Sequence, residues 1–327
     1  MTRRWNWDFE DERRADPGPG PAPAAPVAPA VPPSVATPSP EQRRRTQIRR
    51  RRGAALGVAL LALLAILITA LSGSHSASPA TSSKLATRVA RKRPAGDSEK
   101  HRAAAVSSVL GYTPFAREGG GRGRDIALTF DDGPGPYTPQ VLSVLERLHA
   151  QATFFIVGKM LRYFSASTVR EIEDGDAIGD HTESHPQLAR LSRHDQHEEI
   201  FEGLARVELL GGRRPDLFRP PYGSFNASTL RELHSLHLLM VLWSTDTGDY
   251  AQPGVSTIVE RALAGAHPGA IILMHDAGGT RTETIAALPL IITKLRARGF
   301  HLVTVPQLLL DDPPPAGQQL PTDLSGG

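Results

Sequence analysis

Hydrophobic and polar residues follow two alternating patterns along residues 122–310. Short runs rich in Val, Ile, Leu and Phe are typical of strands, and stretches whose apolar residues recur every three or four positions are typical of amphipathic helices. The predicted strands are residues 125–130, 152–158, 177–181, 217–222, 238–245, 270–276 and 300–305. The predicted helices are residues 139–150, a stretch ending near residue 170, and residues 192–210, 226–237, 254–266 and 282–299.

This alternation of strand and helix over about 180 residues predicts an α/β domain, with a parallel sheet covered by helices. The pattern alone leaves open whether the sheet is open or closes into a barrel. In both arrangements the carboxyl ends of the strands carry the functional site. Polar motifs directly follow several of the predicted strands, so we expect the site at that edge of the sheet.

Two carboxylates follow the first strand, in the motif TFDDGP at residues 129–134. Neighbouring side chains of a strand diverge, so Asp131 and Asp132 can serve different tasks, one binding a metal ion and the other handling a proton. Farther along, HTESHP places His181 and His185 four residues apart. Taken alone, the Asp pair also fits a turn cap and the His pair a polar surface. Together they favour a catalytic metal centre, because two imidazoles and one carboxylate leave coordination positions open.

Three further motifs follow in order: RPPYG at residues 219–223, WSTDTGDY at residues 243–250 and ILMHD at residues 272–276. With TFDDGP and HTESHP, they resemble the five ordered motifs of the polysaccharide deacetylase family. Members of that family are metal-dependent carbohydrate esterases that share the nodulation-protein-B homology domain. The resemblance covers residues 122–310 and implies an irregular (β/α) barrel of about seven strands that removes acetyl groups from a polysaccharide.

The resemblance also implies a role for each matching residue. The metal ligands would be Asp132, His181 and His185, holding a divalent ion that we expect to be Zn, with Co, Ni or Mn as alternatives. Asp131 would be the general base and His275 the general acid. The implied supporting residues are Arg219, which orients the base, Tyr222, whose backbone N–H stabilises the oxyanion, Asp249, which raises the pKa of the acid histidine, and Leu273, Tyr222 and Tyr250, which contact the substrate.

Two positions depart from the family pattern. Asp180 stands where family members often carry Asn, and Tyr250 stands where the fourth motif usually ends in Trp. The Asp180 carboxylate either supports the metal ligands from outside the ligand set or is solvated, and we expect it to be solvated. Tyr250 keeps an aromatic wall but changes its size and adds a hydroxyl. The substrate-facing surface is therefore expected to differ from the family more than the metal site does.

A 19-residue uncharged apolar segment, residues 53–71, is long enough to cross a bilayer as a helix. Seven arginines lie within residues 43–52, whereas residues 72–83 carry no Lys or Arg. The positive-inside rule therefore places the N-terminus in the cytoplasm and the α/β domain outside the cell. A cleavable signal peptide is the alternative, since small residues at 76–80 permit cleavage, but the 52 preceding residues favour a single-pass anchor.

Composition divides the rest of the chain. Residues 1–52 are rich in Pro and Arg and are predicted to be a disordered cytoplasmic tail, residues 72–121 a flexible linker, and residues 311–327 a second disordered tail. Residues 1–121 hold 19 Lys and Arg against 9 Asp and Glu, whereas residues 122–310 hold 18 against 22. The basic excess lies beside the apolar segment, so we expect no nucleic-acid binding by the domain. The chain has no cysteine, so no disulfide supports its core.

Abundant Ala, Arg, Pro and Gly with few Lys suggest a high-GC bacterial genome. An enzyme held outside a bacterial membrane meets the cell wall first, so we expect removal of N-acetyl groups from an extracytoplasmic polysaccharide, with peptidoglycan amino sugars as the leading substrate. Chitooligosaccharides and acetylated xylan are alternatives within the same chemistry. A non-catalytic wall-binding scaffold is a hypothesis of a different class. It is disfavoured because Asp131, Arg219 and His275 are all present.

Overall fold

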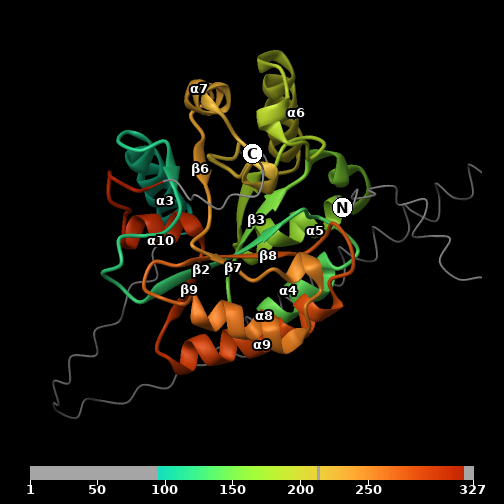
Figure 1. Ribbon diagram of the computed structural model, residues 1–327, viewed down its shortest axis with the longest axis vertical. Helices are drawn as coiled ribbons and strands as arrows, with labels where there is room; N and C mark the ends of the chain where they lie inside the picture. The colour runs from blue at the N-terminus through green and yellow to red at the C-terminus, as the bar shows by residue number, and fades with distance from the viewer. Residues whose placement is uncertain (1–94, 212–213, 320–327) are drawn as a thin grey trace, which may run out of the picture. The chain divides into compact units, whose positions relative to one another are not determined.

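One parallel sheet organises the part of the chain that the computed structural model describes, residues 95–211 and 214–319. Within these residues nine strands pair in the order β1-β6-β5-β4-β3-β2-β8-β7, and β9 pairs with the start of β2. Figure 1 shows helices around these strands. The strands are β1 (Phe115–Ala116), β2 (Asp125–Asp131), β3 (Thr153–Ile156), β4 (Ala177–Asp180), β5 (Leu217–Phe218), β6 (Leu239–Val241), β7 (Thr245–Asp246), β8 (Ile271–His275) and β9 (His301–Val303).

Alternate residues of the central strand β2 face two different hydrophobic cores. Ile126 and Leu128 belong to an outer cluster, which includes residues of the helices α4 (Thr138–Arg147), α8 (Val255–Ala264) and α9 (Thr282–Ala297). Ala127 lies between them in the sequence and belongs to an inner cluster with residues of β3, β5, β6 and β8. Because both faces of the strand are buried, its sequence is an almost continuous apolar run rather than an alternating one.

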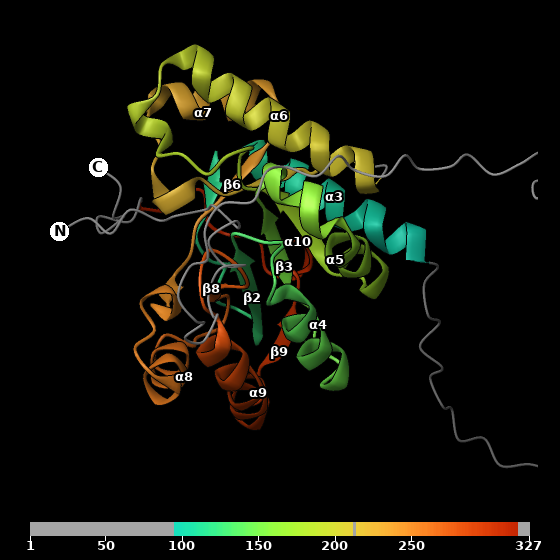
Figure 2. The same cartoon turned by 90° about the vertical axis from the view of Figure 1, so that its right-hand side faces the viewer.

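Helices form a belt around the outer face of the sheet. α8 contacts α9, α9 contacts α4, and α4 contacts α5 (Leu161–Asp174). α5 in turn contacts α6 (Arg193–Gly211), which contacts α7 (Ala227–Ser235). Figure 2 shows α6 and α7 on one side of the strands and α4, α8 and α9 on the other. The predicted α/β class is confirmed, and a parallel sheet with an inner core and an outer belt of helices fits a (β/α) barrel.

The sheet has two more strands than the seven predicted from the sequence. The apolar run at residues 238–245 divides into β6 and β7, because the chain changes partners within it. β6 pairs with β1 and β5, whereas Ser244 donates its N–H to Ile271 O at 3.1 Å and β7 pairs with β8. The other additional strand, β1, has only two residues, too few for a hydrophobic pattern to reveal.

The predicted flexible linker differs from the structure over residues 95–121. The helix α3 (Ala95–Leu110) and β1 occupy most of this segment. Val106 and Val109 are each 1% exposed and join the inner core together with Leu308 of α10 (Val305–Asp311). The Ala- and Ser-rich composition conceals this helix, because two valines three residues apart are enough to give it a buried face.

The start of the predicted C-terminal tail is also held against the domain. Asp312 accepts hydrogen bonds from the backbone N–H groups of Arg122 and Gly123 at 2.7 and 3.2 Å. Tyr112 donates its hydroxyl hydrogen to Pro314 O at 2.7 Å. These contacts join residues about 190 to 200 positions apart in the chain, so the sequence pattern around residue 312 gives no sign of them. The folded domain therefore extends beyond the predicted limits of 122 and 310 at both ends.

No helix among residues 95–211 and 214–319 is long and apolar enough to cross a membrane. The apolar segment predicted to span the bilayer, residues 53–71, lies outside the described residues. The predicted cytoplasmic tail, residues 1–52, lies outside them as well.

Candidate metal centre and active site

The carboxyl ends of the parallel strands bring the five sequence motifs together. Asp131 is the last residue of β2, and it lies in register with His275, the last residue of the neighbouring strand β8. His181 directly follows β4, which lies on the other side of β3 from β2. The segment that begins at Arg219 follows β5, the next strand along the sheet. The predicted position of the site at this edge agrees with the structure.

Three of the predicted residues form a compact ligand set. One ligand atom from each of Asp132, His181 and His185 lies within 4.8 Å of the other two, and all three residues are buried. The Nε2 atoms of His185 and His181 lie 3.0 and 3.7 Å from Asp132 Oδ1. Two imidazole nitrogens and one carboxylate oxygen at this spacing fit a divalent ion such as Zn and leave coordination positions open. The chemistry of the residues therefore fits the implied metal.

Hydrogen bonds to the far nitrogens orient both imidazole rings. His181 Nδ1 donates to the carbonyl oxygen of Arg219 at 2.6 Å, which leaves Nε2 unprotonated in the neutral ring and free to bind a metal ion. His185 Nδ1 lies 3.1 Å from the hydroxyl oxygen of Tyr222. Partners of this kind fix ring orientation in metal sites, and their loss commonly weakens metal binding. The RPPYG motif thus supports both histidines as well as supplying Arg219.

Burial and neighbouring charges set the protonation of these ligands. Burial, partly opposed by Asp131 and Asp132, lowers the pKa of His181 to about 4. Its ring is therefore neutral at pH 7, as a metal ligand requires. Burial raises the pKa of Asp132, but the attraction of His185, His275 and His181 outweighs that effect and holds the pKa below its usual range.

Left-handed backbone conformations concentrate at the ligand residues and beside them. Asp132, Thr182, His185 and Tyr222 have φ values of 77°, 69°, 66° and 60°. Non-glycine residues adopt this region at a cost, and such residues cluster at functional sites. One compensating contact is the hydrogen bond from the backbone N–H of His185 to Thr182 Oγ1 at 2.9 Å. The turns thus keep unfavourable backbone conformations that place the side chains of the candidate ligands in the site.

Arg219 holds the second carboxylate, Asp131, in place. Its side chain is completely buried, and Nη1 donates to Asp131 Oδ1 at 2.7 Å and to Thr129 Oγ1 at 2.8 Å. Nε and Nη2 donate to the carbonyl oxygens of Val241 and Leu242, and the guanidinium lies 4.1 Å from the centre of the Phe155 ring. Asp131 Oδ2 lies 3.8 Å from His181 Nε2, beside the ligand set. Arg219 therefore binds one oxygen of Asp131 and leaves the other facing the candidate metal position.

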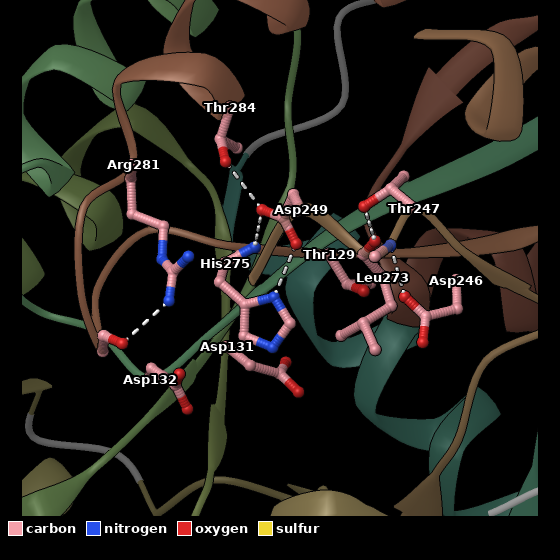
Figure 3. Close-up of polar contacts among 12 residues, drawn as sticks. Thr129, Asp131, Asp132, Asp246, Thr247, Asp249, Leu273, His275, Arg281 and Thr284 are labelled. Carbon is pink, nitrogen blue, oxygen red and sulfur yellow. Dashed lines mark hydrogen bonds and ion pairs between the residues drawn. The ribbon is translucent and has the colours of Figure 1, made fainter. Parts of the chain in front are cut away.

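His275 pairs with the buried Asp249, which lies on the side of the histidine away from Asp131 (Figure 3). Its Nδ1 lies 2.8 Å from Asp249 Oδ1, and its backbone N–H donates to Asp249 Oδ2 at 2.9 Å. Thr284 also donates its hydroxyl hydrogen to Asp249 Oδ2, at 2.7 Å. Burial lowers the pKa of His275, but Asp249, with smaller contributions from Asp132 and Asp131, raises it to about 9. The ring is protonated at neutral pH, so its Nε2–H is available as a proton donor.

The predicted substrate-contacting residues lie around His275 and His185. Tyr250 is 39% exposed, and its ring lies edge-on to the His275 ring with the centroids 5.5 Å apart. Leu273 is 4% exposed, two residues before His275 in β8. Tyr222 packs its ring against His185 at 4.6 Å. The structure thus brings all of the predicted site residues to one edge of the sheet.

Asp180 differs from the expectation of a solvated carboxylate. It is 0% exposed at the end of β4, where its carboxylate packs against Gly203 of α6. Burial raises the pKa of Asp180 well above its usual range. This position therefore favours an uncharged side chain. The Asn that family members often carry there is uncharged. The residues around Asp180 do not indicate this burial, because the helix that covers the carboxylate begins 13 residues later.

Several supporting residues were not among the predicted ones. Thr129 and Asp276 lie within or beside the quoted motifs, so their nearness to the site was available from the sequence. Arg281 is 1% exposed and donates to the carbonyl oxygens of Ala277 and Gly278 at 2.7 and 2.8 Å, which shapes the loop after His275. The sequence around Arg281 and Thr284 does not indicate a role in the site, because both residues lie at the start of an ordinary helix, α9.

Fold and site together define a class of protein: a barrel-like parallel α/β domain with a buried candidate cation site, flanked by a carboxylate and a protonated imidazole. The family model described as polysaccharide deacetylase matches residues 118–241. The chain is also 38% identical over 187 residues to a peptidoglycan-N-acetylglucosamine deacetylase of Bacillus cereus, covering 56% of this chain and 87% of that protein. The chain belongs to the polysaccharide deacetylase family.

Two further relatives agree with this assignment. The peptidoglycan-N-acetylmuramic acid deacetylase PdaC of Bacillus subtilis is 40% identical over 185 residues, which cover 56% of this chain and 38% of PdaC. The match therefore spans well under two thirds of that relative. A crystal structure of a peptidoglycan N-acetylglucosamine deacetylase superposes with a TM-score of 0.59 and 33% identity, covering 62% of this chain and 95% of that one. The implied enzyme family is thus confirmed, and the parallel α/β fold fits the implied barrel.

Proposed function

We propose that this protein removes N-acetyl groups from peptidoglycan amino sugars outside the cell membrane. The observation that carries the proposal is the convergence of the Asp132, His181 and His185 ligand set with Asp131 and His275 at adjacent strand ends. The names of the relatives from Bacillus cereus and Bacillus subtilis support the substrate class. Chitooligosaccharides and acetylated xylan are the alternative substrates within the same chemistry.

Hydrolysis of an amide near pH 7 needs a polarised carbonyl, an activated water and a proton for the departing amine. We propose that the ligand set holds Zn, which supplies a Lewis acid and lowers the pKa of a water. Asp131 takes the proton from the attacking water through Oδ2, while Arg219 fixes its other oxygen. The backbone N–H of Tyr222 stabilises the negative charge that develops on the carbonyl oxygen.

His275 completes the reaction by protonating the leaving nitrogen from Nε2. Asp249 binds Nδ1 and favours the protonated ring, so the proton is held until the carbon–nitrogen bond breaks. Leu273 lines the position of the acetyl methyl, and Tyr250 and Tyr222 contact the sugar. Acetate and a free amino group are the products.

The first test is release of acetate by the purified full-length chain, with peptidoglycan, chitooligosaccharides and acetylated xylan compared side by side. We expect peptidoglycan to give the highest kcat/KM. Treatment with a strong chelator should lower the rate at least about tenfold, and added Zn should restore it, because the metal centre supplies the Lewis acid. Acetate release that resists the chelator would contradict the metal centre. Wall binding without activity on any of the three polymers would support the non-catalytic scaffold.

We also propose that residues 53–71 anchor the enzyme in the membrane as a single helix, with the N-terminus inside. The arginine cluster before this apolar segment and the lack of Lys or Arg directly after it support that orientation. In the expressing cell, the full-length chain should sediment with membranes, whereas deletion of residues 53–71 should abolish that association. Protease added to spheroplasts should degrade the deacetylase domain. Full protection of the domain would overturn the orientation.

A further inference from the structure

One buried carboxyl beside the site has no role in the proposed reaction. Asp276 directly follows His275 and is 0% exposed, just beyond the end of β8. Its backbone N–H donates to the carbonyl oxygen of Asp131 at 3.3 Å, which continues the pairing of β8 with β2. Asp276 therefore lies where the strand carrying the acid meets the strand carrying the base and a metal ligand.

The side chain of Asp276 closes a chain of hydrogen bonds across the turn that follows Asp132. The hydroxyl of Thr138 donates to Asp276 Oδ2, and the same hydroxyl oxygen accepts from the backbone N–H of Gly135 at 2.7 Å. Thr138 is itself 0% exposed. Its single hydroxyl therefore connects the turn after Asp132 to the residue after His275.

Close packing confines the same turn from two sides. A Cβ atom placed on Gly133 would lie 2.5 and 2.6 Å from the two carboxylate oxygens of Asp276, so the carboxyl lies directly against the residue next to Asp132. From the other side, Val157 donates its N–H to Gly133 O at 2.8 Å. A Cβ on Gly135 would come within 2.5 Å of Ala277 Cβ. The turn is thus clamped between the end of β3 and the loop after β8.

The cost of this arrangement indicates that it serves function rather than stability. Asp276 Oδ1 is buried and has no hydrogen-bond partner among the residues that the structure describes. A buried polar atom without a partner destabilises a fold, and an apolar group of similar size would avoid that cost. Asp132 also has φ = 77°, a conformation that persists only where its surroundings enforce it.

We propose that Asp276 is a positioning residue, which acts through Thr138 and Gly133 to hold the Asp131–Asp132 turn in fixed register with His275. The proposal rests on the proposed function for its effect on turnover. Its effect on metal binding stands independently, because Asp132 is a ligand whether or not the substrate is peptidoglycan. The role is geometric: Asp276 Oδ2 accepts a hydrogen bond from the Thr138 hydroxyl, and the planar carboxyl group packs against Gly133.

The test compares four variants in the full-length chain: Asp276→Ala, Asp276→Asn, Thr138→Val and Thr138→Ser. Zn affinity is measured by calorimetry, and kcat and KM by acetate release. Asp276→Ala and Thr138→Val should each weaken Zn binding about tenfold and lower kcat about 10- to 100-fold, with KM changed less than about twofold. Asp276→Asn and Thr138→Ser keep the acceptor and the hydroxyl, so both should stay within about threefold of the wild type.

Asp312→Asn is the matched control, because Asp312 is another buried aspartate that binds backbone N–H groups, far from the site in sequence and contacts. It should leave kcat and Zn affinity unchanged. Wild-type Zn affinity in Asp276→Ala or in Thr138→Val would overturn the proposal. Weakened Zn binding in both Asp276→Asn and Thr138→Ser would overturn it too. An inactive wild type whose Zn affinity still follows this pattern would refute the proposed function alone. If Asp276→Ala does not fold, the Zn affinity and kcat of Thr138→Val test the proposal.

Discussion

Replacing Asp131 with asparagine is expected to lower kcat by at least about 1000-fold while Zn affinity stays within about threefold of the wild type. Asn keeps the size of the side chain and an oxygen that can accept from Arg219 Nη1. It cannot accept a proton from water, and loss of a general base commonly costs two to four orders of magnitude. Asp131 lies outside the candidate ligand set, which consists of Asp132, His181 and His185. Calorimetry with Zn and single-substrate kinetics measure the two quantities.

The matched variant for this experiment is His185→Ala, which removes a ligand and leaves Asp131 and Arg219 untouched. It should lose Zn affinity by several orders of magnitude and recover part of its activity only at high Zn concentration. The contrast between the two variants separates proton transfer from metal binding. If Asp131→Asn and His185→Ala lose Zn to the same extent, the division of roles between Asp131 and Asp132 is wrong.

The candidate ligand set could be predicted from the sequence, because the carboxyl ends of parallel strands lie at one edge of their sheet. Once β2, β4 and β8 are recognised as strands of one parallel sheet, the residues that follow them must meet at one edge. Asp132, His181 and His275 needed only this topology and their motifs to be placed near one another. The detailed roles rested on the resemblance to a family, since spacing alone does not distinguish a ligand from a base.

The contacts that support the site could not be predicted from the sequence, for a different physical reason. Thr284 binds Asp249 across 35 residues of sequence, and Asp312 binds Arg122 across 190. Such partners are chosen by tertiary packing, and neither threonine at a helix start nor aspartate near a chain end is unusual in itself. The same applies to Asp180, which becomes buried only because α6 packs over the end of β4. Local propensity describes the elements, whereas burial depends on what covers them.

Short elements were the other limit of the sequence reading. β1 has two residues, and a period-two pattern needs more positions to be recognised. β7 begins within a predicted run, but the pattern does not show that the chain changes partners there. α3 lies in the predicted linker because Ala and Ser are the commonest residues of its sequence, although Val106 and Val109 belong to the inner core. A helix with so small an apolar face gains its stability from the domain, so its sequence alone resembles that of a linker.

Replacing Asp249 with asparagine is expected to lower activity most strongly on the alkaline side of the pH profile. Only the protonated His275 can donate to the leaving nitrogen, so activity falls as pH rises through the pKa of that ring. Burial lowers this pKa and Asp249 raises it, with a balance at about 9. Without the Asp249 charge, burial prevails, and the alkaline limb of kcat/KM should move about 2 pH units or more toward acid. At pH 8 the variant should be at least about 10-fold slower than the wild type, with a smaller loss at pH 6.

Asp246→Asn provides the control for this pH shift. Asp246 attracts His275 electrostatically, but its carboxylate accepts from the backbone N–H of Gly248 at 2.7 Å and forms no hydrogen bond with the histidine ring; Figure 3 shows both side chains. Removal of its charge should move the alkaline limb by less than about 0.5 pH unit, because a charge without a direct hydrogen bond acts through a more screened interaction. A limb that stays in place in Asp249→Asn, or that moves equally in both variants, would show that the titrating acid is not the His275–Asp249 pair.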